Sequence, residues 1–391
     1  MTDFPSYDVD LFSDEVLAEP YDHYRRIRDL GPVVRLEAHD LLAVSRYDDV
    51  RRVLGDPDTF CSGEGVGLND VVNAKFKGNT LMSDGERHRV QREVVGRPLR
   101  PKALAELQPD VQELADALVD QLVAQGSFDA VVDLAQAIPT TWVPDLLGWP
   151  QEAREHLLDW AGASFDSLGP ANKRCMAAGE QLTDMFRFAF EIAASENLPK
   201  GSFAAGILEA AAKGEITAKQ CPALMTGYLA PSLDTTISAI GNAVWLLATH
   251  PGEWARLREQ PGLVKNAFNE AVRLESPISC FSRVTTGPTK VDGVDVPESA
   301  RILVLYASAN RDERRWERAD EFDITREVST HLGFGYGVHA CAGMGLARLE
   351  GNAVLSALAA RVVTIKPGVP VRKLNNLIRA FSSFPIEVVA R

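Results

Sequence analysis

The chain has 391 residues, of which 46% are hydrophobic, and its 41 basic and 54 acidic residues give a formal net charge of −13. A chain of this length can bury a substantial core, and its acidic balance argues against a nucleic-acid-binding protein. No linker, internal repeat or low-complexity stretch divides the sequence. We therefore expect one large domain over residues 1–391.

The cellular environment is indicated by the N-terminus and the cysteines. The run Met1-Thr2-Asp3-Phe4-Pro5 is polar and acidic, and no apolar segment approaches the ~18 residues of a membrane span. We therefore expect neither a signal peptide nor a membrane anchor. The cysteines are odd in number and widely spaced, a pattern typical of reduced thiols in the cytoplasm. They are Cys61, Cys175, Cys221, Cys280 and Cys341.

The first part of the chain predicts short elements and one long loop. Residues 14–30 have helical periodicity, broken by Pro20, and two apolar runs at 33–37 and 41–45 indicate a β-hairpin. Residues 59–70 form a Gly-rich loop without periodicity. A loop this long in a compact domain is usually functional.

A basic helix is predicted to open at Asp84. It carries His88 and Arg92 four residues apart, so both side chains share one face. This pair is either a solvated basic surface or a site for an anion. The surrounding stretch is the most basic in an acidic chain. We expect part of it, Arg97 and Arg100 in particular, to dock an acidic protein partner.

The middle of the chain is mostly helical by periodicity, over residues 104–124 and 152–212, with a break at residues 164–170. Phe165 and Leu168 lie on one face of the broken helix. Packing into the core is the default interpretation of that face, and lining a cavity is the alternative.

The longest predicted helix begins with a capping-box pattern at Thr217 and ends at His250-Pro251, which gives it a length of roughly 50 Å. Pro231 lies inside it and removes one backbone hydrogen bond, so a kink is expected. Asp234 follows in an otherwise apolar stretch, where a buried charge without a role is costly. Asp234 and Thr235 are therefore either functional or turned towards solvent.

The next predicted helix carries Glu270 and Arg273 at i, i+3, a spacing that by itself indicates no more than a solvated ion pair. Alternating strands with turns follow up to Leu305. Residues 373–389 predict a last hairpin, with Phe381 near its tip.

A Gly-rich run, residues 333–343, precedes a predicted helix over residues 344–363. Cys341 therefore lies at a helix N-terminus, where the helix dipole favours a thiolate. Three interpretations compete: a buried structural cysteine, a dinucleotide-binding loop of the form G-x-G-x-x-A, and a haem thiolate. The second needs a preceding strand, and residues 329–332 are a poor one.

The run also fits the pattern F-x-x-G-x-[RH]-x-C-x-G at every fixed position, and it resembles the cysteine-ligand loop of the cytochrome P-450 monooxygenases. The resemblance covers essentially the whole chain. It implies a mainly α fold with small β-sheets in a single large domain. The matching residues are Phe334, Gly337, His339, Cys341 and Gly343.

The resemblance also implies roles for individual residues. Cys341 is the expected ligand of a haem b iron, and Asp234 with Thr235 is the expected acid–alcohol pair that relays protons during oxygen activation. The family commonly has Ala-Gly where this chain has Pro231 and Ser232. The other cofactor-binding residues implied are His88, Arg92, Arg283, Phe334, His339 and Gly343, and the structural ionic cluster implied is Glu270, Arg273 and Arg326.

Among family members, the chain is most similar to soluble bacterial enzymes that oxidise para-substituted benzoates, for example by O-demethylating 4-methoxybenzoate. Those enzymes hold the carboxylate with Arg and Ser, at positions that align with Glu64, Asn69, Thr226 and Gly227 here. Because Glu64 would repel a carboxylate, we expect a phenol, methoxyphenol or aromatic amine. The substrate-binding residues expected are Glu64, Val66, Leu68, Asn69, Phe165, Leu168, Thr226, Ala230, Ile278, Phe281 and Phe381.

The resemblance therefore predicts a cytoplasmic monooxygenase of aromatic catabolism. It would hydroxylate or O-demethylate a small aromatic substrate with O2 and with electrons from a ferredoxin and a ferredoxin reductase. Three alternatives stay open: a para-substituted benzoate O-demethylase, a peroxide-driven peroxygenase, and a non-catalytic haem sensor or electron carrier.

Overall fold

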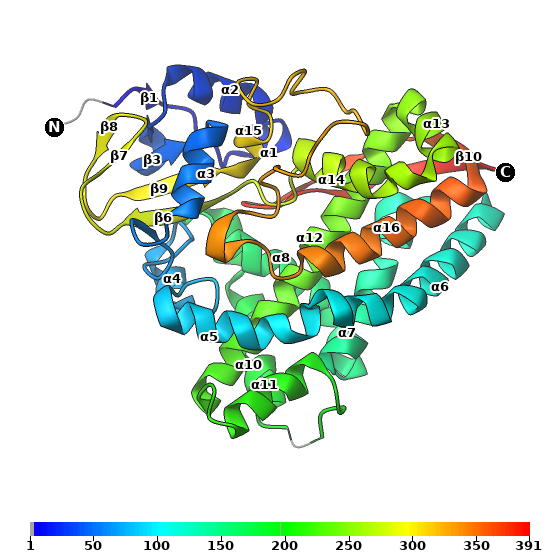
Figure 1. The fold of residues 1–391 in the computed structure, drawn as a ribbon, viewed down its shortest axis with the longest axis horizontal. Helices are drawn as coiled ribbons and strands as arrows, with labels where there is room; N and C mark the ends of the chain where they lie inside the picture. Colours follow the sequence, from blue (N-terminus) through cyan, green and yellow to red (C-terminus); the bar gives the residue numbers. More distant parts are fainter. Residues whose placement is uncertain (1–3, 196) are drawn as a thin grey trace.

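A computed structural model describes residues 4–195 and 197–391, apart from the side chains of residues 152 and 230. Figure 1 shows a wedge-shaped molecule in which helices fill most of the volume, with the labelled strands up to β9 (Arg301–Leu305) gathered near the N-terminus and β10 (Val362–Pro367) lying on the opposite side near the C-terminus. The predicted fold class, mainly α with small sheets, is confirmed. None of the described helices is both long enough and apolar enough to cross a bilayer.

The described α-helices have the following bounds: α1 Asp14–Ala18, α2 Tyr21–Leu30, α3 Tyr47–Gly55, α4 Asp70–Phe76, α5 Gly85–Gly96, α6 Pro101–Gln125, α7 Ala137–Leu147, α8 Leu157–Ser167, α9 Lys173–Ala177, α10 Gly179–Ala193, α11 Phe203–Ala212, α12 Cys221–Thr249, α13 Pro251–Glu259, α14 Val264–Leu274, α15 Tyr306–Ala309 and α16 Met344–Arg361.

The described strands have the following bounds: β1 Ser6–Tyr7, β2 Val34–Leu36, β3 Leu41–Val44, β4 Phe60–Cys61, β5 Ser127–Asp129, β6 Cys280–Thr285, β7 Thr289–Val291, β8 Val294–Val296, β9 Arg301–Leu305, β10 Val362–Pro367, β11 Val371–Leu374, β12 Arg379–Ser383 and β13 Pro385–Ala390.

Helix α12 is the axis of the molecule. It packs against α7, α8, α10, α14 and α16, and Figure 1 shows it running behind α16 through the centre. The predicted capping box is present at Thr217, but it caps a short 3₁₀ turn, and α12 begins after that turn at Cys221. The helix continues through Pro231 without interruption. Because Pro231 has no N–H, one backbone hydrogen bond is nevertheless missing inside it.

The strands form one larger sheet and three small ones. The larger sheet has the order β1-β2-β3-β9-β6-β4, in which the predicted hairpin is confirmed as the antiparallel pair β2–β3, with Val34 opposite Ala43. The predicted last hairpin is wrong in detail. Strands β11 and β12 form that hairpin around residues 375–378, so Phe381 lies within β12 and not at the tip.

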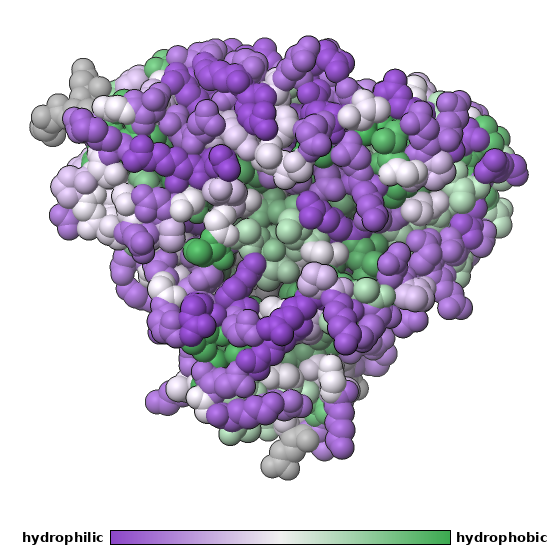
Figure 2. Space-filling model, viewed as in Figure 1, coloured by the Kyte–Doolittle hydropathy of each residue, from purple (hydrophilic) through white to green (hydrophobic). Residues whose placement is uncertain are grey.

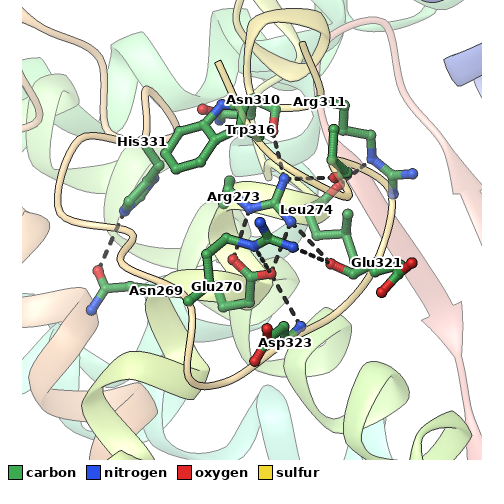
Figure 3. A network of polar contacts seen from close by, with 12 residues as sticks. Asn269, Glu270, Arg273, Leu274, Asn310, Arg311, Trp316, Glu321, Asp323 and His331 are labelled. Carbon is green, nitrogen blue, oxygen red and sulfur yellow. Dashed lines mark hydrogen bonds and ion pairs between the residues drawn. The ribbon is translucent and has the colours of Figure 1, made fainter. Parts of the chain in front are cut away.

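A buried ionic cluster supports the loop that leads to Cys341. Glu270 and Arg273 are both fully buried, with Arg273 Nε 2.7 Å from Glu270 Oε2, and Arg326 Nε lies 3.0 Å from Glu270 Oε1 (Figure 3). Arg273 also donates to the backbone oxygens of Asn310 and Ala319, at 2.7 and 2.8 Å. The alternative of a solvated pair is therefore excluded, and the expected cluster is present. It fastens residues 310–326 to α14.

Candidate active site

A largely apolar cavity of about 300 Å³ lies between α12 and the loop that contains Cys341. Helices α5, α7, α8, α10, α11, α15 and α16, strand β6 and residues 76–82 also contribute to its walls. Both the sulfur-bearing loop and the middle of α12 face this one space. The residues that line it therefore define the candidate active site.

The Cys341 loop has the backbone that its glycines were expected to provide. Gly335 and Gly337 have φ values of 71° and 72°, in the left-handed region that favours glycine. A Cβ on Gly337 would lie 2.6 Å from the Leu54 carbonyl oxygen, so only glycine fits against α3. The Cys341 N–H donates to the Phe334 carbonyl at 2.8 Å, which closes the loop.

Cys341 lines the cavity, whereas the other described cysteines are buried elsewhere. Burial raises the pKa of its thiol, but N–H groups of Gly343 and Met344 point at the sulfur and, with Arg92 and Arg348, act in the opposite direction. No strand precedes the loop among residues 326–336, which argues against a dinucleotide site. Because the Cys341 side chain faces the cavity, a buried structural role for this cysteine is also disfavoured.

Basic side chains around the cavity fit the carboxylates of a haem. His88, Arg92, Arg283 and His339 all line it. The ring centroids of His88 and His339 lie 4.0 Å apart, and the buried Nε2 atom of each has no hydrogen-bond partner within the described residues, although His339 Nε2 lies 3.7 Å from Asp84 Oδ1. Unpartnered buried nitrogens require an explanation, and a propionate supplies one. Burial lowers the pKa of His88 to about 4, and the neighbouring His339 and Arg92 act in the same direction.

The acid–alcohol pair on α12 is divided between two environments. Thr235 lines the cavity, and its hydroxyl donates to the Pro231 carbonyl at 2.7 Å. Asp234 is only 3% exposed, which excludes the alternative of a solvated face. Its carboxylate accepts two hydrogen bonds from Lys373 Nζ on β11, at 2.8 and 3.0 Å. Asp234 does not line the cavity directly.

Five of the residues expected to bind substrate line the cavity. Phe165 and Leu168 come from the end of α8, Thr226 comes from α12, and Ile278 and Phe281 come from the segment after α14. The break predicted near residues 164–170 is therefore a cavity wall. Ala230 was also expected here, but its side chain lies outside the described residues.

The roof loop does not contribute the residues expected of it. Glu64 is 61% exposed and pairs with Lys77 at 3.1 Å, outside the cavity. Val66 and Leu68 are also absent from the lining, as is Asn69, which caps α4 and donates to Cys175 Sγ. The cause is that Arg301 and Asn73 bind the loop's backbone oxygens at Gly65 and Gly67 and hold it against β6. Glu64 therefore does not disfavour a carboxylate in the cavity.

Phe381 was also expected at the cavity, and this expectation is wrong. It is buried in β12, where its ring packs on Trp245 at a centroid distance of 5.3 Å. The Arg372 guanidinium covers the ring at 3.8 Å. Phe381 therefore anchors the hairpin β11–β12 to α12.

Several cavity residues were missed because their sequence pattern is that of an ordinary core. Met185 is part of an apolar stripe on α10, and periodicity alone does not separate a core stripe from a cavity wall. Phe76, at the end of α4, packs on Phe186 of α10 at 5.1 Å. The lining residues not anticipated from the sequence include Phe76, Leu81, Met82, Met185, Phe203 and Tyr228.

The basic stretch around α5 is less available to a partner than expected. Arg97 pairs with Glu215 and with Glu93, and Arg100 also pairs with Glu93. Arg89 pairs with Glu86. Intramolecular acids therefore offset much of the positive charge at the positions expected to dock a protein.

Comparisons with known proteins agree with this site. The cytochrome P450 family model matches residues 165–361. The chain is 41% identical over 389 residues to cytochrome P450 CYP199A2 of Rhodopseudomonas palustris, covering 98% of this chain and 94% of that protein. It is 30% identical over 400 residues to the cytochrome P450 monooxygenase PikC of Streptomyces venezuelae, covering 98% and 94%.

Solved structures share the fold over its full length. Cytochrome P450 CYP109Q5 from Chondromyces apiculatus matches with a TM-score of 0.83 at 29% identity, covering 98% of this chain and 99% of that one. The fold and the cysteine-lined cavity define a haem enzyme with a thiolate ligand. The chain belongs to the cytochrome P450 family, and it is a P450 monooxygenase.

Proposed function

We propose that this monooxygenase hydroxylates or O-demethylates a small, neutral aromatic molecule. The proposal is carried by one observation: apart from Cys341, Tyr228 and Tyr306, the ionisable side chains among the described lining residues are the four that we assign to the propionates, His88, Arg92, Arg283 and His339. The remaining described lining is apolar or neutral, with Phe165, Phe281 and Leu168 as walls. Such walls suit an aromatic ring, and among the described lining residues no cation other than those assigned to the propionates is left for a carboxylate.

Cys341 is the ligand we assign to the haem. When bound, the haem supplies oxygen activation, which the electron density of a thiolate favours. The N–H groups of Gly343 and Met344 orient the sulfur and moderate its charge. His88 and His339 offer ring nitrogens without a hydrogen-bond partner to the propionates, and Arg92 and Arg283 supply the charge.

Proton delivery is assigned to α12. The Thr235 hydroxyl is held at the cavity wall by the Pro231 carbonyl, where it presents its oxygen to the reacting side. Behind it, Asp234 holds a carboxylate that is linked to the surface by Lys373, whose side chain is 32% exposed. Protons therefore have a route from solvent towards the cavity through Lys373, Asp234 and Thr235, with water as the connecting carrier.

Electrons would come from a ferredoxin that docks over the Cys341 loop. In Figure 2 a pale, weakly hydrophobic area occupies the middle of the face, over the loop and the start of α16 in Figure 1, and hydrophilic residues surround it. Tyr336 and Val338 of the loop are exposed, and the Arg51 guanidinium lies 4.6 Å from the Tyr336 ring centroid. An apolar centre with a cationic edge suits an acidic electron carrier.

The substrate proposal is tested by titrating the haem protein with matched pairs of small aromatics. Each pair has one neutral member, such as 4-methoxytoluene, and one carboxylate, such as 4-methoxybenzoate. We expect a haem spin shift and product from the neutral member, with at least tenfold weaker binding of the carboxylate. Tight binding of the carboxylates contradicts the proposal. Turnover with peroxide alone favours a peroxygenase, and no spin shift with any aromatic favours a sensor.

A further inference from the structure

The backbone of α12 is irregular where it passes the cavity. In a regular helix the carbonyl of Gly227 accepts the N–H of residue 231, but Pro231 has no N–H. A proline ring in a helix also crowds the carbonyl four residues before it. Gly227 O therefore lacks its helical donor.

The neighbouring hydroxyl groups do not replace that donor. Thr226 Oγ1 donates to the Ala223 carbonyl at 2.8 Å, and Ser232 Oγ donates to the Leu229 carbonyl at 3.2 Å. The Tyr228 hydroxyl donates to the Val95 carbonyl at 2.8 Å. The three nearest hydroxyls on α12 are thus bound to other oxygens.

Gly227 also faces open space. Both Gly227 and Pro231 line the cavity, as expected for positions four residues apart on one helix face. A Cβ added at Gly227 would meet no atom within 4 Å, and the residue is exposed although its neighbours Thr226 and Tyr228 are buried. The Gly227 backbone therefore borders the cavity, and its carbonyl, which has no helical donor, is open to a hydrogen-bond donor held there.

We propose that the Gly227 carbonyl oxygen is a substrate-binding group that accepts a hydrogen bond from an aromatic hydroxyl. The inference rests on the proposed function and narrows its substrate class to phenols. Thr235 follows Gly227 by eight residues, roughly 12 Å along the helix axis. A substrate held by its hydroxyl at Gly227 therefore extends towards Thr235, and the reacting group lies para to the hydroxyl.

The test compares two neutral ligands that differ in one hydrogen-bond donor, 4-methoxyphenol and 1,4-dimethoxybenzene. Dissociation constants for the haem protein are measured by spin shift and by calorimetry. We expect wild type to bind the phenol roughly tenfold more tightly, equivalent to about 1.4 kcal/mol. Pro231→Ala and Pro231→Val both restore the backbone N–H at position 231. The two replacement side chains differ in volume, so an effect shared by both variants does not come from a change in cavity size. Because the N–H then occupies Gly227 O, both variants should bind the two ligands equally.

The outcomes separate this inference from the proposal on which it rests. Spin shifts with equal affinity of wild type for both ligands overturn the inference and leave the small-aromatic proposal intact. If both proline variants still bind the phenol more tightly, the inference is also overturned, because the phenol hydroxyl then donates to a group other than the Gly227 carbonyl. Absence of binding by either ligand overturns both. Neither substitution endangers folding, since Ala and Val cost a helix interior less than Pro.

Discussion

Lys373 Nζ lies 2.8 Å from Oδ1 and 3.0 Å from Oδ2 of Asp234, and this contact joins β11 to the middle of α12. The Asp234 side chain is 5% exposed and the Lys373 side chain is 32% exposed. Asp234, to which we assign proton delivery, is therefore paired with a cation that reaches solvent. Replacing Lys373 and replacing Asp234 should therefore have different effects on stability.

Lys373→Met leaves a buried carboxylate without its counter-charge. We expect a loss of about 2 kcal/mol in the free energy of unfolding, below the ~3–5 kcal/mol of fully buried pairs, because Lys373 is partly in water. Asp234 also loses the group that orients it, so more electrons should be released as peroxide and fewer used for product. Urea unfolding and the ratio of product to electrons consumed measure the two effects.

Lys366→Met is the matched control, because Lys366 and its partner Glu387 are both more than 60% exposed. It should change neither stability nor coupling, since exposed pairs contribute little. In the double variant Lys373→Met with Asp234→Asn, the buried charge is gone, so stability should recover while proton delivery stays impaired. Equal destabilisation by both lysine variants would contradict the assigned contact.

Haem retention is expected to depend on Arg92. Its side chain lines the cavity and donates to the Ala340 carbonyl, next to Cys341. If Arg92 binds a propionate as we propose, Arg92→Leu would remove a charge-assisted contact, so the rate of haem loss to a scavenging protein should rise roughly tenfold, or about 1.4 kcal/mol. Arg89→Leu is the control, because Arg89 is 68% exposed and pairs with Glu86. Equal rates for the two variants would contradict the assignment.

Carboxylate binding should be created by a single substitution on α12. Thr226 is buried at the cavity wall, so Thr226→Arg places a cation among neutral groups. The affinity for 4-methoxybenzoate, measured by spin shift, should rise at least tenfold over wild type. Glu64→Gln should leave it unchanged, because Glu64 lies outside the cavity, paired with Lys77. An increase with Glu64→Gln would restore the roof loop as a binding element.

Local patterns predicted the parts of the site that depend on short-range geometry. The spacing of Gly335, Gly337 and Cys341 fixes a loop whose positive φ angles follow from the residues themselves. The pair His88 and Arg92 shares a cavity-facing side because helical spacing dictates it. Helix α12 was likewise evident from its caps and length.

Long-range contacts account for what the sequence did not reveal. The roof loop turns away from the cavity because Arg301, 237 residues after Glu64, binds its backbone. Arg97 and Arg100 are offset by acids that include Glu215, 118 residues away from Arg97. Side-chain partners at such separations leave no periodicity. The exposure of Glu64 and the pairing of Arg97 and Arg100 could therefore not be predicted from residues nearby in the sequence.

Glu350 provides a test of burial in the helix that follows the cysteine. It is fully buried on α16, and neither carboxyl oxygen has a hydrogen-bond partner among the described residues. Burial raises the pKa of Glu350 well above its usual value, so the folded protein holds a proton that the unfolded chain releases near pH 4.3. When the pKa of a group is higher in the folded than in the unfolded state, the free energy of unfolding decreases as pH rises. The decrease is up to about 1.4 kcal/mol per pH unit above the unfolded pKa.

Glu350→Gln does not titrate, so its stability relative to wild type should increase between pH 4.5 and pH 7.5, by on the order of 1–3 kcal/mol. The measurement is the urea midpoint of the haem protein at both pH values. Glu113→Gln, at an exposed position on α6, controls for the loss of one negative charge and should follow wild type. A difference between Glu350→Gln and wild type that stays constant with pH would show that Glu350 is charged in the folded state. It would then need a partner inside the protein, because an isolated buried carboxylate is too costly to maintain.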